Sequence, residues 1–211
     1  MTERTRVRRL PDKQVADRAV LDSILDAGRL AHIAVDDGGQ PFALPVTYVR
    51  DGDRVLVHGS TGSRLFRLLA EGAPACLTVT LLDGLVVARS AFGSTMNYRC
   101  AMVLGRGHAL DRQAKERALH RLSEHVMPGR WAEARPPNTR ELAATLVVAL
   151  PLDEWSVKVS AGPPEDEAAD LDWPAWAGVV PLREVLDEPL GAPDLRVDAA
   201  VPAYVRTWGR L

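Results

Sequence analysis

The sequence predicts a small antiparallel β-barrel with peripheral helices, a mainly β fold of the α+β class. Short β runs dominate the chain, about seven in all, and most are joined by turn signals typical of antiparallel hairpins. The few helical segments do not alternate with single strands, which excludes a doubly wound parallel sheet. The 211 residues, 46% of them hydrophobic, are enough to bury one ordinary core.

The first half of the chain opens with a predicted helix over residues 13–27, with Asp12 as its N-cap and Gly28 as its end. Three β runs follow, at residues 30–35, 42–49 and 54–58. Because proline cannot donate to a ladder, Pro41 and Pro45 place the second run at a sheet edge or at an irregularity. A glycine-bearing loop then leads into a short helix.

The second half contains two strong β runs, residues 75–82 and 85–92, joined by Asp83-Gly84, a typical hairpin signal. Further along, the pattern predicts an extended segment at 96–110, a helix at 111–126, an ordered loop at 127–138, and strands at 146–150 and 155–159. Residues 1–164 are therefore expected to form the barrel domain with its N-terminal helix. Residues 165–211 are expected to form a tail with little regular sheet, which docks on the barrel through Trp173 and Trp176.

The overall charge limits the partners. With 26 basic and 28 acidic residues, the chain lacks the broad basic footprint of a nucleic-acid-binding protein. No apolar run reaches the length needed to span a bilayer, and the charged N-terminus is not followed by a signal-peptide core. We therefore expect a cytoplasmic protein.

Cys76 and Cys100, which lie in apolar stretches without a CxxC pattern, are predicted to be small buried side chains.

The loop at residues 58–64 is the first candidate site. It follows a strand and precedes a helix, so its glycines, hydroxyl groups and Arg64 could bind a phosphate at the helix N-terminus. The alternative is an ordinary serine N-cap with glycines that only allow the turn. The loop lacks the Gly-Lys-Ser/Thr ending of a Walker loop.

A second candidate begins at Arg89, a cation inside an apolar strand. It needs an anionic partner, either a carboxylate of the same chain or a ligand. Asn97 and Tyr98 follow Gly93-Ser94, where the β pattern is interrupted, as pocket-lining residues often do.

His120 and His125 are five residues apart on the predicted helix, so they do not share a face and are expected to be exposed. A Ser/His/Asp hydrolase is not supported, because no Gly-x-Ser-x-Gly motif is present.

Several motifs together resemble the pyridoxamine 5′-phosphate oxidase-like, FMN-binding split-barrel superfamily, and in particular its flavin-nucleotide-binding, nitroimidazole-resistance-like subgroup. The matching segments are residues 58–60 with 63–64, 78–85, 88–92 with 96–99, 128–131, and Lys158 with 162–164. The resemblance implies a six-stranded antiparallel Greek-key split barrel that forms a homodimer, with FMN at the subunit interface. The cofactor-binding residues it implies are Pro45, Val46, Thr47, Tyr48, His58, Ser60, Ser63, Arg64, Arg89, Asn97, Tyr98 and Lys158.

The chain departs from this pattern in three places. Close relatives carry a His-His pair at Gly93-Ser94 and an arginine at Ser160, so small residues replace polar ones near the implied pocket. Such changes either widen the pocket for another ligand or weaken flavin binding. The C-terminal segment at 202–208 also lacks the basic motif of true pyridoxamine phosphate oxidases, which argues against that activity.

Three functions remain open from the sequence. The first is an FMN-dependent oxidoreductase acting on an unidentified small molecule, in which the flavin supplies the redox chemistry and the catalytic side chains stay unknown. The second is a split barrel that binds haem or another planar cofactor, with His58 or His108 as axial ligand. The third is a cofactor-poor binding or sensor homodimer. No metal-ion site, nucleic acid or membrane partner is predicted.

Overall fold

The computed structural model describes residues 2–196 and 200–208. Its strands are β1 (Gln14–Val15), β2 (Leu30–Asp37), β3 (Gln40–Arg50), β4 (Arg54–Ser60), β5 (Pro74–Val87), β6 (Thr95–Arg106), β7 (His108–Ala109), β8 (Thr145–Pro151), β9 (Glu154–Ser160) and β10 (Gly178–Pro181). Its α-helices are α1 (Arg18–Ala27), α2 (Arg64–Ala70), α3 (Arg112–Val126), α4 (Arg130–Glu133), α5 (Thr139–Ala143) and α6 (Ala203–Thr207). No helix within these ranges has the length and apolar character required to cross a bilayer.

The strands form an antiparallel split barrel, as predicted. Their order is β1-β9-β6-β5-β2-β3-β4-β8-β7, and β10 pairs with the outer part of β5. The implied count of six strands is too low, because the described chain adds the short strands β1, β7 and β10 and one more long strand. Inward-facing side chains of β2–β6, β8 and β9 pack with one face of α1 into the main core. A smaller core lies between α3 and the neighbouring strands β4 and β8.

The expected hairpin at Asp83-Gly84 does not form. Residues 74–87 are one strand, with a register shift between Leu82 and Gly84, and the chain reverses only after Val87. A Cβ at residue 84 would lie 3.0 Å from the Val180 carbonyl oxygen, so the glycine allows β10 to approach β5 closely. The Asp83-Gly84 signal therefore corresponds to a β-bulge rather than a turn, because pairing with β6 and β10 keeps β5 continuous through these residues.

The first helix is shorter than predicted. It begins at Arg18 with Asp17 as N-cap, whose side chain accepts from the Ala19 N–H at 2.8 Å. Residues Gln14 and Val15 instead extend the sheet as β1, opposite Lys158 and Val157 of β9. Gln14 and Val15 can pair with β9 because the helix does not need to begin at Asp12. Asp17, five residues further on, provides a second N-cap.

The two prolines of β3 lie where that strand has a neighbour on one side only. Residues 40–47 pair with β2, whereas β4 pairs only with residues 48–50. The predicted edge position is thus confirmed locally, although β3 as a whole lies between β2 and β4. This leaves the edge and outer face of β3 around Pro45 open.

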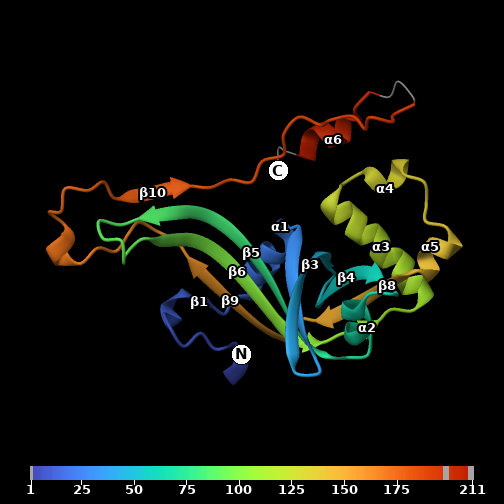
Figure 1. Cartoon of the computed structure of the whole chain (residues 1–211), viewed down its shortest axis with the longest axis horizontal. Coiled ribbons are helices and arrows are strands. Elements are labelled where there is room, and N and C mark those ends of the chain that lie inside the picture. Colours follow the sequence, from blue (N-terminus) through green and yellow to red (C-terminus); the bar gives the residue numbers. More distant parts are fainter. Residues whose placement is uncertain (1, 197–199, 209–211) are drawn as a thin grey trace.

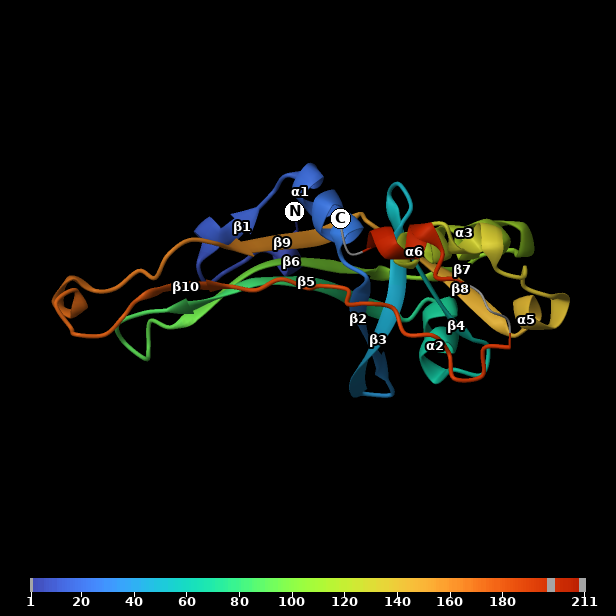
Figure 2. The ribbon, with the colours of Figure 1, turned by 90° about the horizontal axis from the view of Figure 1, so that it is seen from above.

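One long arm gives the molecule an elongated shape. The β5–β6 hairpin extends well beyond the barrel, with β10 along its edge (Figures 1 and 2). From β10 the tail returns past α1 to α6, where the Trp208 indole N–H donates to the Pro128 carbonyl at 2.9 Å. The expected docking through Trp173 and Trp176 is wrong, because both are about two-thirds exposed; β10 and Trp208 hold the tail instead.

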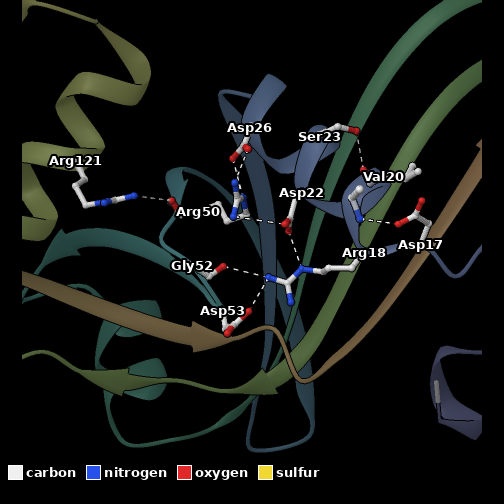
Figure 3. A network of polar contacts seen from close by, with 11 residues as sticks. Asp17, Arg18, Val20, Asp22, Ser23, Asp26, Arg50, Gly52, Asp53 and Arg121 are labelled. Carbon is white, nitrogen blue, oxygen red and sulfur yellow. Dashed lines mark hydrogen bonds and ion pairs between the residues drawn. The ribbon is translucent and has the colours of Figure 1, made fainter.

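A network of arginines and aspartates ties α1 to the β3–β4 turn and to α3 (Figure 3). Arg50 contacts Asp26 at 2.6 Å, Arg18 bridges Asp22 and Asp53, and Arg121 lies 3.2 Å from Asp51. These bonds fix the position of the C-terminal end of α1, which borders a cavity described below.

Candidate functional site

A cavity of about 680 Å³ lies between the barrel wall and the helices α3–α5. Thr47 of β3 and His58 of β4, both predicted site residues, form its floor. The helical wall consists of Leu119, Leu122, Ser123, Val126, Met127, Arg130, Trp131, Ala134, Arg135, Pro136, Pro137 and Glu141, with Thr145 at the start of β8. Its volume is in the range of natural ligand sites, and its lining is mainly apolar.

His58 is the titratable group at the centre of this floor. Its side chain is half-buried, and burial lowers the pKa of its imidazole below the ordinary value, since a buried site disfavours the charged form. The ring is therefore neutral at pH 7. Its Nδ1 lies 3.4 Å from the Thr47 hydroxyl, and no other hydrogen-bond partner of the ring exists among the described residues. The imidazole thus contacts Thr47 through Nδ1, which leaves Nε2 without a partner in the described part of the chain.

Two arginines of the helical wall are each paired with a glutamate. Arg135 contacts Glu141 at 2.7 Å, and Arg130 lies 3.3 Å from Glu133 and 3.4 Å from the Tyr204 hydroxyl. The α3–α5 wall was not foreseen as part of a site. Only the apolar spacing of Leu119, Leu122 and Val126 along α3 hinted at a second buried face.

Gly59 follows His58, and its small size serves packing rather than anion binding. A Cβ at this position would overlap the ring of Phe66, which is 5% exposed and belongs to the main core. A Cβ at Gly62, in contrast, would have only the Ser60 hydroxyl within contact range, at 3.6 Å.

We therefore expect Gly59→Ala to destabilise the protein by about 1–3 kcal/mol through overpacking, whereas Gly62→Ala is near neutral. Thermal unfolding of both variants checks this, with a fall in Tm of about 2–12 °C expected for Gly59→Ala alone. Equal Tm values for the two variants would show that the Phe66 contact can relax without cost.

The predicted phosphate loop lies at the end of β4. Ser60 accepts from the Gly62 N–H at 3.1 Å, and Ser63 is the N-cap residue of α2 but forms no side-chain cap bond. The Arg64 guanidinium lies 4.4 Å from the centre of the Phe42 ring and 3.3 Å from Asp37, and its side chain is 63% exposed. Arg64 is thus held over the open part of β3 and accessible to a ligand.

The four predicted residues of β3 alternate between two faces. Pro45 and Thr47 lie on the outer face, whereas Val46 is 8% exposed and Tyr48 fully buried. The Tyr48 hydroxyl donates to the Leu25 carbonyl at 2.8 Å, and burial raises its pKa. Strand alternation thus directs the Tyr48 side chain into the core, and its predicted place along a cofactor stays a prediction for the backbone of β3.

Arg89, also predicted to bind the cofactor, has a carboxylate partner within the chain. Its guanidinium contacts Asp166 at 2.7 Å, and its backbone N–H donates to the same carboxylate at 2.8 Å. Desolvation opposes ionisation of Asp166, but the hydrogen bonds from Arg89 prevail and lower its pKa. The intramolecular ion pair, left open by the sequence, is the one that forms, and it ties the acidic tail to the tip of the β5–β6 hairpin.

The remaining predicted residues lie far from the His58 cavity. Asn97 and Tyr98 are on β6, and Asn97 donates to the Gly162 carbonyl at 3.0 Å; Lys158 is on β9. Asn97 pairs with Gly84, six residues beyond the last β5 residue that pairs with β2, which is about 20 Å along the strand. Within one chain, therefore, Asn97 and its neighbour Tyr98 are not brought to Thr47 and Arg64, and Lys158, opposite Cys100 of β6, lies four strands away from β3 in the sheet.

Ser94 and Ser160, two of the small residues at which this chain departs from its relatives, have hydrogen-bond partners within the chain. The Ser94 hydroxyl donates to the Ser90 carbonyl and accepts from the Ala88 N–H, both at 3.1 Å, which closes the hairpin turn. At the third departure, the Lys13 ammonium donates to the Ser160 hydroxyl at 2.9 Å. A cation from the N-terminal segment thus lies beside the position where relatives carry arginine.

Other histidines and the cysteines fall outside the site. His108 is exposed on β7, and His120 is exposed as predicted. The prediction for His125 is wrong, since it is half-buried and its Nε2 lies 2.8 Å from the Gly28 carbonyl oxygen. Cys76 and Cys100 are half-buried rather than buried, and burial raises the pKa of the Cys76 thiol. No cluster of metal-ligating side chains exists in the described part of the chain.

The fold and the cavity together define a split β-barrel with a histidine-bearing, largely apolar ligand cavity. The sequence profile of the pyridoxamine 5′-phosphate oxidase family matches residues 17–159, and the chain belongs to this family. No curated protein sequence matches it.

Among solved structures, the FAD and haem binding protein of Mycobacterium smegmatis is 45% identical, with a TM-score of 0.88 over 92% of this chain and 96% of that one. The flavocytochrome Anf3 of Azotobacter vinelandii is 39% identical, with a TM-score of 0.92 over 98% of this chain and 96% of that one. A candidate 5-nitroimidazole antibiotic resistance protein of Bacteroides thetaiotaomicron shares the fold at 19% identity, with a TM-score of 0.59 over 69% of this chain and 86% of that one.

Proposed function

We propose that the protein is a flavin- and haem-dependent oxidoreductase that works as a homodimer. The observation that carries the proposal is the neutral, half-buried His58 on the floor of an apolar cavity of about 680 Å³. Two relatives at 45% and 39% identity, an FAD and haem binding protein and a flavocytochrome, support it. When bound, the flavin supplies hydride or two-electron chemistry and the haem supplies one-electron chemistry.

The cavity fits a haem in three respects. His58 would hold the haem iron through its unpartnered ring nitrogen, Thr47 would orient the imidazole from its other nitrogen, and the apolar helical wall would shield the bound group from water. Arg130 and Arg135 would face the propionates, in competition with Glu133 and Glu141. His108, the other ligand considered from the sequence, is exposed and lines no part of this cavity.

The flavin would lie along the open edge of β3, where residues 40–47 have no partner on the β4 side. Arg64, above Phe42, would hold its phosphate, with Ser60 and Ser63 beside it. From Phe42 to Thr47 the strand rises by about 17 Å, so the ring end of an extended flavin with its phosphate at Arg64 would reach the His58 cavity. Thr47 would therefore lie between the two cofactors. The resemblance implies FMN, whereas the Mycobacterium relative binds FAD, and we expect FAD here.

The absorbance spectrum of the purified protein tests the proposal directly. We expect the visible bands of an oxidised flavin together with a haem Soret band, and reverse-phase chromatography of the released flavin identifies it as FAD or FMN. A spectrum with flavin alone would reduce the function to the flavin oxidoreductase. A spectrum with neither cofactor would leave the binding or sensor homodimer and overturn the proposal.

The separation of the predicted site residues supports a dimer. Asn97, Tyr98 and Lys158 can complete the flavin site of Arg64 and Thr47 only if they come from a second subunit. The β2–β6 surface also exposes apolar side chains that a partner would cover, including Leu30, Leu44 and Met96, each 44–52% exposed. Light scattering after size exclusion is expected to give twice the chain mass of 23.0 kDa. A monomer that retains both cofactors would contradict the shared site.

A further inference from the structure

A second large cavity, of about 840 Å³, shares no lining residue with the cavity around His58. It is bounded by the C-terminal end of α1, the free edge of β5, His125 of α3, and tail residues 182–184 where the tail passes α1 (Figure 1). None of the residues assigned above to flavin or haem lines it. It therefore belongs to neither proposed cofactor site.

The charges in this cavity are unevenly paired. Asp83 is bound by Arg99 through two contacts of 2.7 and 2.9 Å, which lower the pKa of its carboxyl group. Asp26 is bound by Arg50 from outside the cavity, through contacts of 2.6 and 2.8 Å (Figure 3). Both carboxylates are thus already neutralised.

Two cations remain. Among the described residues, neither Arg29 nor Arg183 has an acidic partner within 4 Å, and Glu184 is the one lining acid without an arginine. An arginine guanidinium forms strong paired hydrogen bonds with carboxylate and phosphate groups. The cavity therefore presents two available guanidinium groups, one from the barrel and one from the tail.

The opposite wall offers hydrogen bonds without charge. Pairing of β5 with β2 ends at Thr78, and pairing with β10 begins at Gly84, so the edge between them has no strand partner. In an antiparallel strand every second residue turns its backbone N–H and C=O to a given edge. Leu81, Leu82 and Leu182 add apolar surface between this edge and the arginines.

We propose that this cavity binds a small anionic molecule, with a phosphate or carboxylate group between Arg29 and Arg183 and an uncharged, hydrogen-bonding part against the free edge of β5. The tail forms one wall, held by the β10–β5 ladder and by the Leu182 N–H, which donates to the Asp83 carbonyl at 3.0 Å. Binding in this cavity therefore depends on the tail.

Titration calorimetry of the purified, cofactor-loaded protein tests the site, with pyrophosphate and citrate as separate probes. We expect saturable binding of at least one probe, weakened about tenfold or more by Arg29→Gln and by Arg183→Gln. Tighter binding of pyrophosphate identifies a phosphate ligand, and tighter binding of citrate a carboxylate ligand. The visible spectrum of both variants should match that of the wild type, because neither arginine borders a cofactor.

The matched control is Arg112→Gln, at the exposed start of α3, where Glu116 lies 3.7 Å away. It should bind the probes like the wild type. Equal affinities in all four proteins would mean that the anions bind elsewhere and would overturn the proposal, as would no binding of either probe. Because these readouts do not depend on flavin or haem, they fail or succeed independently of the proposed function.

Discussion

Replacing His58 by alanine is expected to remove haem from the protein. The variant should purify without a Soret band, because His58 is the one histidine that lines the 680 Å³ cavity in the described chain. The imidazole is half-buried and outside both apolar cores, so its loss should leave the fold intact. The haem content is measured by the pyridine haemochrome method and the fold by circular dichroism.

Two controls sharpen this experiment. His108→Ala removes an exposed histidine of β7 and should keep its haem. Added imidazole should enter the space left in His58→Ala and restore part of the Soret band. Thr47→Val, which removes the hydroxyl beside Nδ1, is expected to lower haem affinity by about 10–100-fold. A full haem content in His58→Ala would exclude His58 as the ligand.

Replacing Arg64 by alanine is expected to weaken FMN and FAD binding much more than riboflavin binding. The guanidinium is expected to contact a phosphate, which riboflavin lacks, and one charged hydrogen bond corresponds to about 10–150-fold in Kd. Because the side chain is 63% exposed, its removal should cost little stability. Flavin fluorescence titrations of the flavin-free protein with the three ligands measure the difference.

The same helix supplies a matched control. Arg67→Ala removes an exposed arginine of α2 and should change none of the three affinities. Asp37→Asn removes the carboxylate that competes for Arg64 and should strengthen the binding of phosphorylated flavins. If Arg64→Ala weakened riboflavin as much as FMN, its role would be to pack on Phe42 rather than to bind phosphate.

Several features could be predicted from local pattern. Alternation and turn signals identified most strands, and the segment from His58 to Arg64 was recognised as a candidate site. The α3 helix follows the predicted range closely, because its N-cap Asp111 and its apolar face are both local signals. The proposed shared dimer site rests on the resemblance and not on local pattern, since the residues involved lie on strands far apart in one chain.

The sequence by itself determined the antiparallel barrel, the helices α1, α2 and α3, and the candidate ligand His58, because side-chain period and capping act over a few residues. It did not predict α4, which lies in the segment 127–138 expected to be a loop. Only the tertiary structure decided that Asp83-Gly84 is a bulge, that Arg89 pairs with Asp166, 77 residues away, and that α3–α5 enclose His58. Each of these outcomes depends on which distant segments become neighbours. Local propensity contains no information on that choice, which is made by burial and pairing across the whole chain.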